Sequence, residues 1–366
     1  TPLYSSAASD VYKRQISNKH MRHFTKHIIY ITLLIMQAIP SNAQHQRLRQ
    51  QILVGFYNCE NYYDTINQAN VVDEEFLPNS EKKYNQLAYD TKSERLATVI
   101  YKLGMLENLN GIALLGLAEI ENKIVLNKLI TSPLLKKYHY KFIHFDSKDP
   151  RGVDVALIYN PAQFTPYQYL PYSLTDETHF NTFATRDILY VKGRLANEWV
   201  HILVNHWPSR RGGEKSSANK RIWASRICKN IMDSVYALDS NAKFIVMGDF
   251  NDNPTNNSLK QLQMENPFTK KFKNGLGSLA YNDAWNLFDQ ILLSPKWNTP
   301  TLGKNTNFTL NNYKSIIYNN QALVETNGKY AGYPKRTYSG SQFAGGFSDH
   351  FPVALIFTLK MTENPH

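Results

Sequence analysis

Short apolar runs that end in acidic, amide or imidazole side chains recur from about residue 50 to residue 360 of this sequence. Most of them are rich in β-branched or aromatic residues, which favour strands. Loops rich in Asn, Gly and Pro separate the runs, and no repeat period is present. The pattern predicts a single mixed domain over residues 44–366. Its predicted strands are 52–57, 112–118, 140–145, 153–159, 188–195, 199–204, 244–247, 290–293 and 352–359.

Longer amphipathic stretches between the strands predict helices. In the third of them, Ile222, Ile227 and Ile231 lie among basic residues, which predicts one face packed on a sheet and the other in water. Several strands are apolar at nearly every position, as expected when both faces are covered. The predicted fold class is therefore α/β, a sandwich of two packed sheets with helices outside. The predicted helices are 84–103, 123–135, 217–237 and 258–264.

The N-terminal segment has the pattern of a processing signal rather than of a folded domain. Residues 1–20 precede Met21 and do not resemble a native leader, so we exclude them from the fold. Residues 21–43 combine a basic start, an apolar stretch at 28–39 and small residues before Gln44, which predicts a secretory signal peptide. A buried helix is the alternative. The apolar stretch is too short to span a bilayer, so we expect a secreted or periplasmic protein without a membrane span.

The charge balance favours an anionic partner. The sequence holds 41 Lys and Arg against 30 Asp and Glu, a net charge of +11. Five of the basic residues and one acidic residue precede Gln44, so the chain from Gln44 onward carries +7. A moderately basic protein attracts polyanions such as nucleic acid.

The two cysteines, Cys59 and Cys228, are too few for a disulfide framework or a Cys-rich zinc site. Cys59 falls in an apolar strand pattern and Cys228 in a helical one. We therefore expect two buried free thiols, with the hydrophobic core as the main source of stability.

Polar side chains gather where the predicted strands end or begin. Singly, each fits an ordinary turn; residues 249–254, for example, also fit a turn before the helix at 258. Together, so many buried carboxylates without a cation would be strongly destabilised by repulsion and desolvation. Oxygen-rich donors without cysteine indicate Mg²⁺, Mn²⁺ or Ca²⁺ rather than structural zinc. The residues concerned are Asn58, Glu60, Glu119, Asp154, Asn205, His206, Asp249, Asn251, Asp289, Asp349 and His350.

These residues occur in an order that resembles the motif set of the endonuclease/exonuclease/phosphatase superfamily, the DNase I-like metal-dependent phosphoesterases. A lone match would be weak, whereas all of them in order, each at a strand edge, form a specific signal. The resemblance implies a four-layer sandwich, with the active site where loops from both sheets meet. The matching segments are 57–61 (YNCEN), 117–119 (LAE), 205–206 (NH), 248–251 (GDFN), 288–289 (FD) and 348–350 (SDH).

The resemblance implies a metal site. Glu119 would be the principal ligand, with Asn58 and Glu60 beside it. Asp349 would lie near the same or a second metal position. Strand alternation independently predicts that Asn58 and Glu60 face the same side, which suits a shared ligand.

The resemblance also implies catalytic roles. Asp249 would orient or deprotonate the attacking water, and Asn251 would hold that water or a phosphate oxygen. His350, aligned by Asp289, would stabilise the charged transition state or protonate the leaving group. His206 would contact the phosphate.

Three further residues are predicted to bind substrate or to support its binding. Arg210 and Arg211 follow His206 closely, and a forked guanidinium there suits a second phosphate. A flexible, solvated basic loop is the alternative. Asp154 has no motif position, and we hypothesise that it braces His206.

The sequence thus predicts a secreted, divalent-metal-dependent phosphoester hydrolase, with a nuclease or phosphodiesterase as the leading interpretation. Phosphatase or sphingomyelinase-type lipid phosphodiesterase activity is the alternative within the same fold. The alternative that is not an enzyme is a catalytically inactive nucleic-acid-binding module. We expect a monomer that takes a phosphoester substrate.

Overall fold

The apolar runs of the sequence form two β-sheets that differ in strand order. The structure is a computed structural model, which describes residues 50–174, 184–196, 198–298, 306–307 and 313–361. The predicted leader at 1–20 and signal peptide at 21–43 lie outside these residues and stay predictions. All the strands expected from the sequence form, most of them within one or two residues of the expected bounds.

The first sheet has the strand order β12-β16-β1-β2-β4-β3, and β13 also pairs with β16. The central pair β1 and β2 is parallel, and the other pairs are antiparallel. Its strands are β1 (Gln50–Tyr62), β2 (Leu114–Ile120), β3 (Lys141–His144), β4 (Asp154–Tyr159), β12 (Thr306–Asn307), β13 (Tyr313–Ile317) and β16 (Val353–Met361).

The second sheet has the order β11-β8-β7-β6-β5, with β7 and β8 parallel and the rest antiparallel. Sequence patterning missed β5 because it is an edge strand with two prolines and mostly exposed side chains. The strands are β5 (Phe164–Tyr172), β6 (Ile188–Leu195), β7 (Glu198–His206), β8 (Phe244–Asp249) and β11 (Asp289–Leu293). Two small ribbons complete the set: β9 (Leu279–Tyr281) with β10 (Ala284–Asn286), and β14 (Tyr338–Ser339) with β15 (Gln342–Phe343).

The first two helices begin at side-chain caps, and the third, long helix follows Gly213. The Asn85 side chain accepts a hydrogen bond from the Ala88 N–H, and Asn122 caps the next helix in the same way. Two predicted helices are shorter than expected: the one at 123–135 ends at Ile130, and the one at 258–264 keeps a single turn. The α-helices are α2 (Gln86–Leu103), α3 (Lys123–Ile130), α4 (Glu214–Leu238), α5 (Asn257–Lys260) and α6 (Thr269–Lys273). The 3₁₀ turns are Glu74–Phe76, Leu106–Asn108, Lys136–Tyr138, Pro295–Asn298, Gln321–Leu323 and Gly328–Tyr330.

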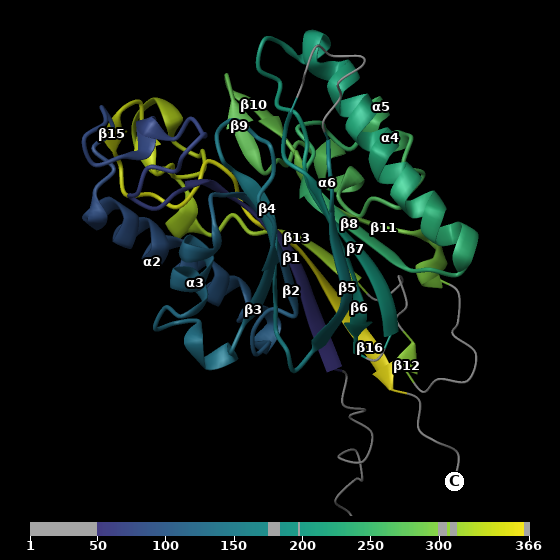
Figure 1. The fold of residues 1–366 in the computed structure, drawn as a ribbon. Helices are drawn as coiled ribbons and strands as arrows, with labels where there is room; N and C mark the ends of the chain where they lie inside the picture. The colour runs from purple at the N-terminus through teal and green to yellow at the C-terminus, as the bar shows by residue number, and fades with distance from the viewer. Residues whose placement is uncertain (1–49, 175–183, 197, 299–305, 308–312, 362–366) are drawn as a thin grey trace, which may run out of the picture. The chain divides into compact units, whose positions relative to one another are not determined.

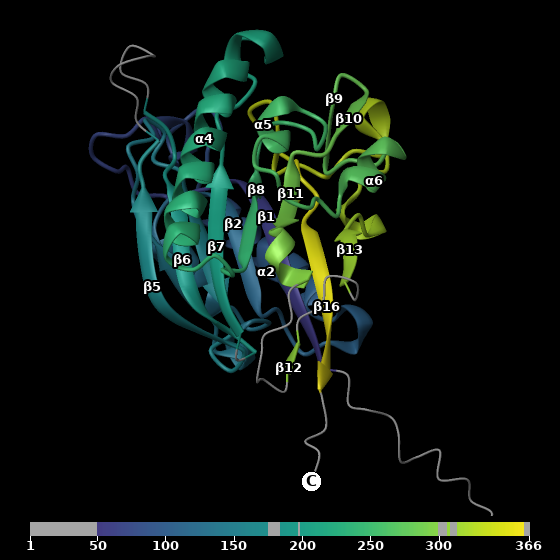
Figure 2. The same cartoon turned by 90° about the vertical axis from the view of Figure 1, so that its right-hand side faces the viewer.

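Strand alternation places the core in three layers. On β1, Leu53 and Tyr57 pack with α2 and α3, whereas Val54 and Phe56 pack between the two sheets. On the far side, α4 covers the outer face of the second sheet. Figure 1 shows α2 and α3 beside the first sheet, and Figure 2 shows α4 lying along β6 and β7. The predicted four-layer α/β sandwich is confirmed.

Both cysteines are buried free thiols, as expected, and they belong to different core clusters. Burial raises the pKa of the Cys59 thiol to about 12, so it stays protonated. Within the described ranges, no helix has the length and apolar content needed to cross a membrane.

Gly248 marks a close approach between the parallel strands β7 and β8. A Cβ atom at this position would lie 2.3 Å from the backbone oxygen of Asn205. We expect Gly248→Ala to lower the free energy of unfolding by about 1–3 kcal/mol, because the strands must separate locally. Urea unfolding measures this, and Gly340→Ala, with open space around it, is a control for backbone strain alone. An unchanged unfolding midpoint for Gly248→Ala would contradict the packing described.

Candidate active site

Three of the expected site residues form one row across the second sheet. Because β7 and β8 are parallel, their carboxyl ends meet, and His206 lies opposite Asp249. In the next pair Asp289, the first residue of β11, lies opposite Asp249. Side chains in register on neighbouring strands point to the same face of a sheet, so the pairing itself brings these three together.

Asp249 is the centre of this row and is 2 % exposed. Its Oδ2 accepts a hydrogen bond of 3.1 Å from Nδ2 of Asn58, which reaches across from the first sheet. The same oxygen lies 3.7 Å from Nε2 of His206 and 4.0 Å from Nε2 of His350. Burial raises the pKa of Asp249 to about 6, and the charge of Asp289 contributes. The carboxylate is therefore mostly ionised at neutral pH and able to accept a proton.

His350 and Asp289 form the pair expected from the sequence. Nδ1 of His350 lies 2.6 Å from Oδ2 of Asp289, and the Ser278 hydroxyl donates to the same oxygen. Burial acts to lower the pKa of His350, but the charge and hydrogen bond of Asp289 outweigh it and raise the pKa well above its usual range. The ring is thus an imidazolium whose Nε2 faces Asp249, an arrangement that can deliver a proton.

His206 has the opposite character. Its Nε2 lies 3.9 Å from Oε1 of Glu119, and its buried Nδ1 has no hydrogen-bond partner among the described residues. Burial lowers the pKa of His206 well below its usual range, and the charges of Arg186 and Arg151 lower it further. The ring is therefore neutral at physiological pH.

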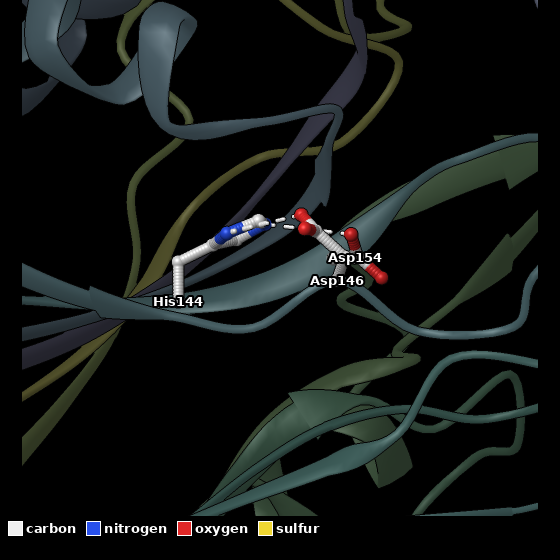
Figure 3. Close-up of side chains that lie close together, drawn as sticks. All are labelled: His144, Asp146 and Asp154. Carbon is white, nitrogen blue, oxygen red and sulfur yellow. Dashed lines mark ion pairs between the residues drawn. The ribbon is translucent and has the colours of Figure 1, made fainter. Parts of the chain in front are cut away.

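The hypothesis that Asp154 braces His206 is wrong. Oδ2 of Asp154 lies 3.4 Å from Nε2 of His144, and its Oδ1 accepts a hydrogen bond from the Ser147 N–H. Figure 3 shows Asp154 beside His144. The reason lies in strand order: β4 carries Asp154 between β2 and β3, so its neighbour at this end is the last residue of β3 rather than of β7.

Glu119 and Asp349 each keep one carboxylate oxygen that makes no hydrogen bond with the described residues. Oε2 of Glu119 accepts the Asn61 N–H at 2.8 Å, whereas its Oε1 faces His206 at 3.9 Å. Oδ2 of Asp349 binds Arg336, whereas its Oδ1 lies 3.9 Å from His350. Each of these oxygens is a donor of the kind that a hard divalent cation takes.

Glu60 does not share the surroundings of Asn58 as strand alternation predicted. Its φ of 50° interrupts the alternation, and the β1–β2 register shifts at this point. Its carboxylate accepts hydrogen bonds from Arg336 Nε at 3.1 Å and from the Thr337 N–H at 2.7 Å. Burial raises the pKa of Glu60, as does the charge of Asp349. Both of its oxygens are therefore engaged by the chain.

Asn251 and Arg210 lie together just beyond β8. The Asn251 side chain donates to the Trp207 carbonyl at 2.9 Å, and its backbone N–H binds Oδ1 of Asp249. Arg210 donates to the Asn251 carbonyl and to Asp252, and its guanidinium lies over the Phe288 ring. The Arg210 side chain thus supports the loop that carries Asn251.

Arg211, by contrast, has an exposed side chain. Its backbone N–H contacts the Ser209 hydroxyl at 3.5 Å. A role for Arg211 in gripping a phosphate stays a prediction.

Sequence reasoning missed several cations of the site. Arg336 bridges Glu60 and Asp349, and Arg186 is buried between Asp149 and the Trp207 carbonyl. Neither residue carries a local signal, because a single arginine in a loop is unremarkable among 41 basic residues. The structure alone brings them to the site.

Lys92 could have been found from the sequence. It lies on the same helical face as Ala88 and Leu96, four residues away on either side, and all three are buried. A lysine on an apolar helical face is rare unless it is paired. Its ammonium group binds the Phe347 carbonyl at 2.7 Å and lies 4.0 Å from Glu60.

A model of the endonuclease/exonuclease/phosphatase family matches residues 53–359. This chain belongs to the endonuclease/exonuclease/phosphatase family. The resemblance stated from the motifs is confirmed. Membership makes the protein an enzyme that hydrolyses phosphoesters, as the sequence predicted.

Solved structures share the fold of this family member at low identity. Truncated TDP2 from Caenorhabditis elegans superposes with a TM-score of 0.50 at 13% identity, covering 84% of this chain and 97% of that one. Another structure of C. elegans TDP2 gives 0.51 at 12% identity, covering 98% and 95%. A mannosyl-6-phosphatase from Bacteroides thetaiotaomicron gives 0.49 at 15% identity, covering 83% and 98%. A search of curated protein sequences gives no match.

The Asp289–His350 pair gives a direct test in this family member. We expect Asp289→Asn to lower kcat for a phosphodiester by about 100-fold with KM nearly unchanged, because His350 loses the charge that holds its proton and tautomer. Steady-state kinetics with a far-ultraviolet dichroism check of the fold measures this. Ser278→Ala, which removes only the hydroxyl bound to Asp289, should cost a few-fold at most. Wild-type kcat in Asp289→Asn would contradict a positioning role.

Proposed function

We propose that this protein is a divalent-metal-dependent phosphodiesterase, with nucleic acid as the leading substrate class. The observation that carries the proposal is the environment of Asp249: a buried, ionised carboxylate lies between a neutral His206 and a charged His350. A proton acceptor and a proton donor close to one another are what hydrolysis of a phosphodiester requires.

The proposed reaction has two proton transfers: one from water to Asp249, and one from His350 to the leaving oxygen. Asp249 accepts a proton from the attacking water as the water oxygen bonds to phosphorus. The bond from phosphorus to the leaving oxygen breaks, and Nε2 of His350 delivers its proton to that oxygen. The neutral His206, opposite Asp249 in the sheet, contacts a phosphate oxygen.

The proposed metal ligands are Glu119 and Asp349, with Asn58 beside them. A divalent cation bound there neutralises charge on the phosphate and polarises its oxygens. Their oxygen donors favour Mg²⁺, with Mn²⁺ and Ca²⁺ as alternatives. Glu60, engaged by Arg336 and a backbone N–H, keeps that arginine in place instead.

The surface beside Glu60 supports a nucleotide-bearing substrate. A cavity of about 200 Å³ there is lined by Lys82 and Arg336 and by the aromatic rings of Phe76 and Tyr338. Cationic groups in a groove follow the phosphates of a nucleic-acid backbone. The Phe76 ring itself stacks on Tyr63 and lies under Lys82, so it shapes the cavity rather than offering a face to a base. The positive charge of the chain acts in the same direction.

One panel of substrates tests the proposal. Purified protein is assayed with bis-p-nitrophenyl phosphate, plasmid DNA, RNA, sphingomyelin and inositol phosphates, with Mg²⁺ or with a chelator. We expect Mg²⁺-dependent cleavage of the generic diester and of nucleic acid. If sphingomyelin or a phosphomonoester were turned over faster than nucleic acid, that compound class would replace nucleic acid as the proposed substrate. Nucleic-acid binding without any hydrolysis would support the inactive binding module.

We further propose that the protein is exported, on the basis of the pattern at 21–43. Mass spectrometry of the mature protein from an expressing bacterium should find an N-terminus at or near Gln44 in the periplasm or medium. An N-terminus that retains residues 21–43 in the cytoplasm would refute export.

A further inference from the structure

A second cluster of metal-binding side chains lies at the β3–β4 connection. His144 is the last residue of β3, Asp146 follows in the loop and Asp154 is the first residue of β4. Nε2 of His144 lies 3.4 Å from Oδ2 of Asp154, and its Nδ1 lies 3.8 Å from Oδ1 of Asp146. One ligand atom from each residue lies within 4.8 Å of the others. Figure 3 shows both carboxylates near the ring.

The His144 ring is buried without a hydrogen-bond partner among the described residues. The residue is 5 % exposed, and neither ring nitrogen makes a hydrogen bond with any described residue. An imidazolium held by carboxylates forms hydrogen bonds of about 2.7–2.9 Å. The observed separations are longer, so the two acids lie beside the ring without hydrogen bonds to it, Asp154 at Nε2 and Asp146 at Nδ1. A buried polar ring of this kind is costly unless something else satisfies it.

We propose that His144, Asp146 and Asp154 bind one divalent cation of the zinc class. One imidazole nitrogen and two carboxylate oxygens are ligands that Zn²⁺ takes in tetrahedral sites, with water as the fourth. The cluster is separate from Glu119 and Asp349, whose carboxylate oxygens lie near His206 and His350 instead. No hydrogen bond or ion pair among the described residues joins the cluster to His206, Asp249 or His350.

The surroundings of Asp154 carry excess negative charge, which a cation would offset. A cavity of about 10 Å³ beside it is also lined by Asp187, whose buried Oδ1 has no hydrogen-bond partner among the described residues. That volume is about what one water molecule needs. Asp187 is thus placed to accept a hydrogen bond from a water bound to the cation.

A cation at this position would fix both ends of the loop at 145–153. The same loop carries Asp149, which pairs with Arg186, and Arg151, whose carbonyl accepts the Tyr63 hydroxyl. Arg186 in turn donates to the Trp207 carbonyl, next to His206. The inferred site therefore stabilises the loop that holds the cationic side of the active site, and it is structural rather than catalytic.

Zinc content and thermal stability test this inference. The full chain is stripped with a chelator and dialysed against Zn²⁺ in excess Mg²⁺, and bound zinc is measured by mass spectrometry. Asp146→Asn is the main variant, because the Asp146 side chain is exposed and the fold does not depend on it. His144→Gln removes the nitrogen ligand. Asp233→Asn, which removes an exposed carboxylate from α4, is the matched control, and Glu119→Ala reports on the catalytic site.

We expect Asp146→Asn and His144→Gln to lose one equivalent of zinc or at least about tenfold in affinity. Zn²⁺ at 100 times its Kd should raise the Tm of the wild type by about 5 °C or more, and should not raise that of the two variants. Asp233→Asn and Glu119→Ala should keep this response. Equal zinc content and equal Tm response in wild type and Asp146→Asn would overturn the inference. His144 would then contact the two acids without a cation.

Discussion

Asp249→Asn is expected to lower kcat/KM for phosphodiester hydrolysis by about 1,000-fold or more. Asparagine keeps the size of the side chain and the oxygen that accepts the Asn251 N–H, so packing changes little. It loses the carboxylate that takes the water proton, and with Oδ2 it loses the acceptor of the Asn58 hydrogen bond. Rates with bis-p-nitrophenyl phosphate at saturating Mg²⁺ measure the effect.

The control for this variant is Asp233→Asn, an exposed position on α4 that pairs only with Lys229 among the described residues. It should keep wild-type turnover, and both variants should keep the wild-type dichroism spectrum. A loss of less than about tenfold in Asp249→Asn would mean that another group accepts the proton. His206, which is neutral and lies 3.7 Å away, would then be the next candidate.

Glu119→Ala is expected to weaken activation by Mg²⁺ and to lower kcat/KM by about 1,000-fold, since a metal in such sites contributes several kcal/mol to transition-state stabilisation. The variant removes the Oε1 atom that faces His206. It also removes the acceptor of the Asn61 N–H, so we expect a loss of about 1 kcal/mol in the free energy of unfolding. Activity titrated against Mg²⁺ concentration separates the two effects.

Glu94→Gln provides the matched control, because Glu94 is an exposed glutamate on α2. It should leave both activity and the Mg²⁺ titration unchanged. An unchanged Mg²⁺ titration in Glu119→Ala would remove Glu119 from the proposed ligand set. Asp349 would then have to hold the cation without it.

Local sequence patterns predicted a side chain's position correctly where that position depends only on the strand that carries the residue. Asp289 was expected to open a strand and does so, because β-branched runs and their polar ends are local properties. Its pairing with His350 was implied by the family resemblance instead. The local pattern failed at Glu60, where a left-handed residue at the end of β1 breaks the period of two. A left-handed backbone conformation cannot be predicted from a single sequence when the residue that adopts it is not glycine.

Asp154 shows a different limit. Its strand was predicted correctly, but its partner depends on which strand lies beside it. Sheet order put β3 there, so the contact is to His144 and not to His206. The positions of Arg186 and Arg336 at the site likewise could not be predicted, because both residues lie in loops whose path does not follow from the local sequence pattern.

By itself the sequence determined most strands of the two sheets, the layered arrangement and the polar groups at strand ends, because periodicity and propensity act over a few neighbouring residues. It missed β5 and β13. Only the tertiary structure decided which of those polar groups meet. The bond between Asn58 and Asp249 joins residues 191 positions apart and depends on how the two sheets pack. The opposite protonation of His206 and His350 likewise depends on burial and on charges that arrive from distant segments.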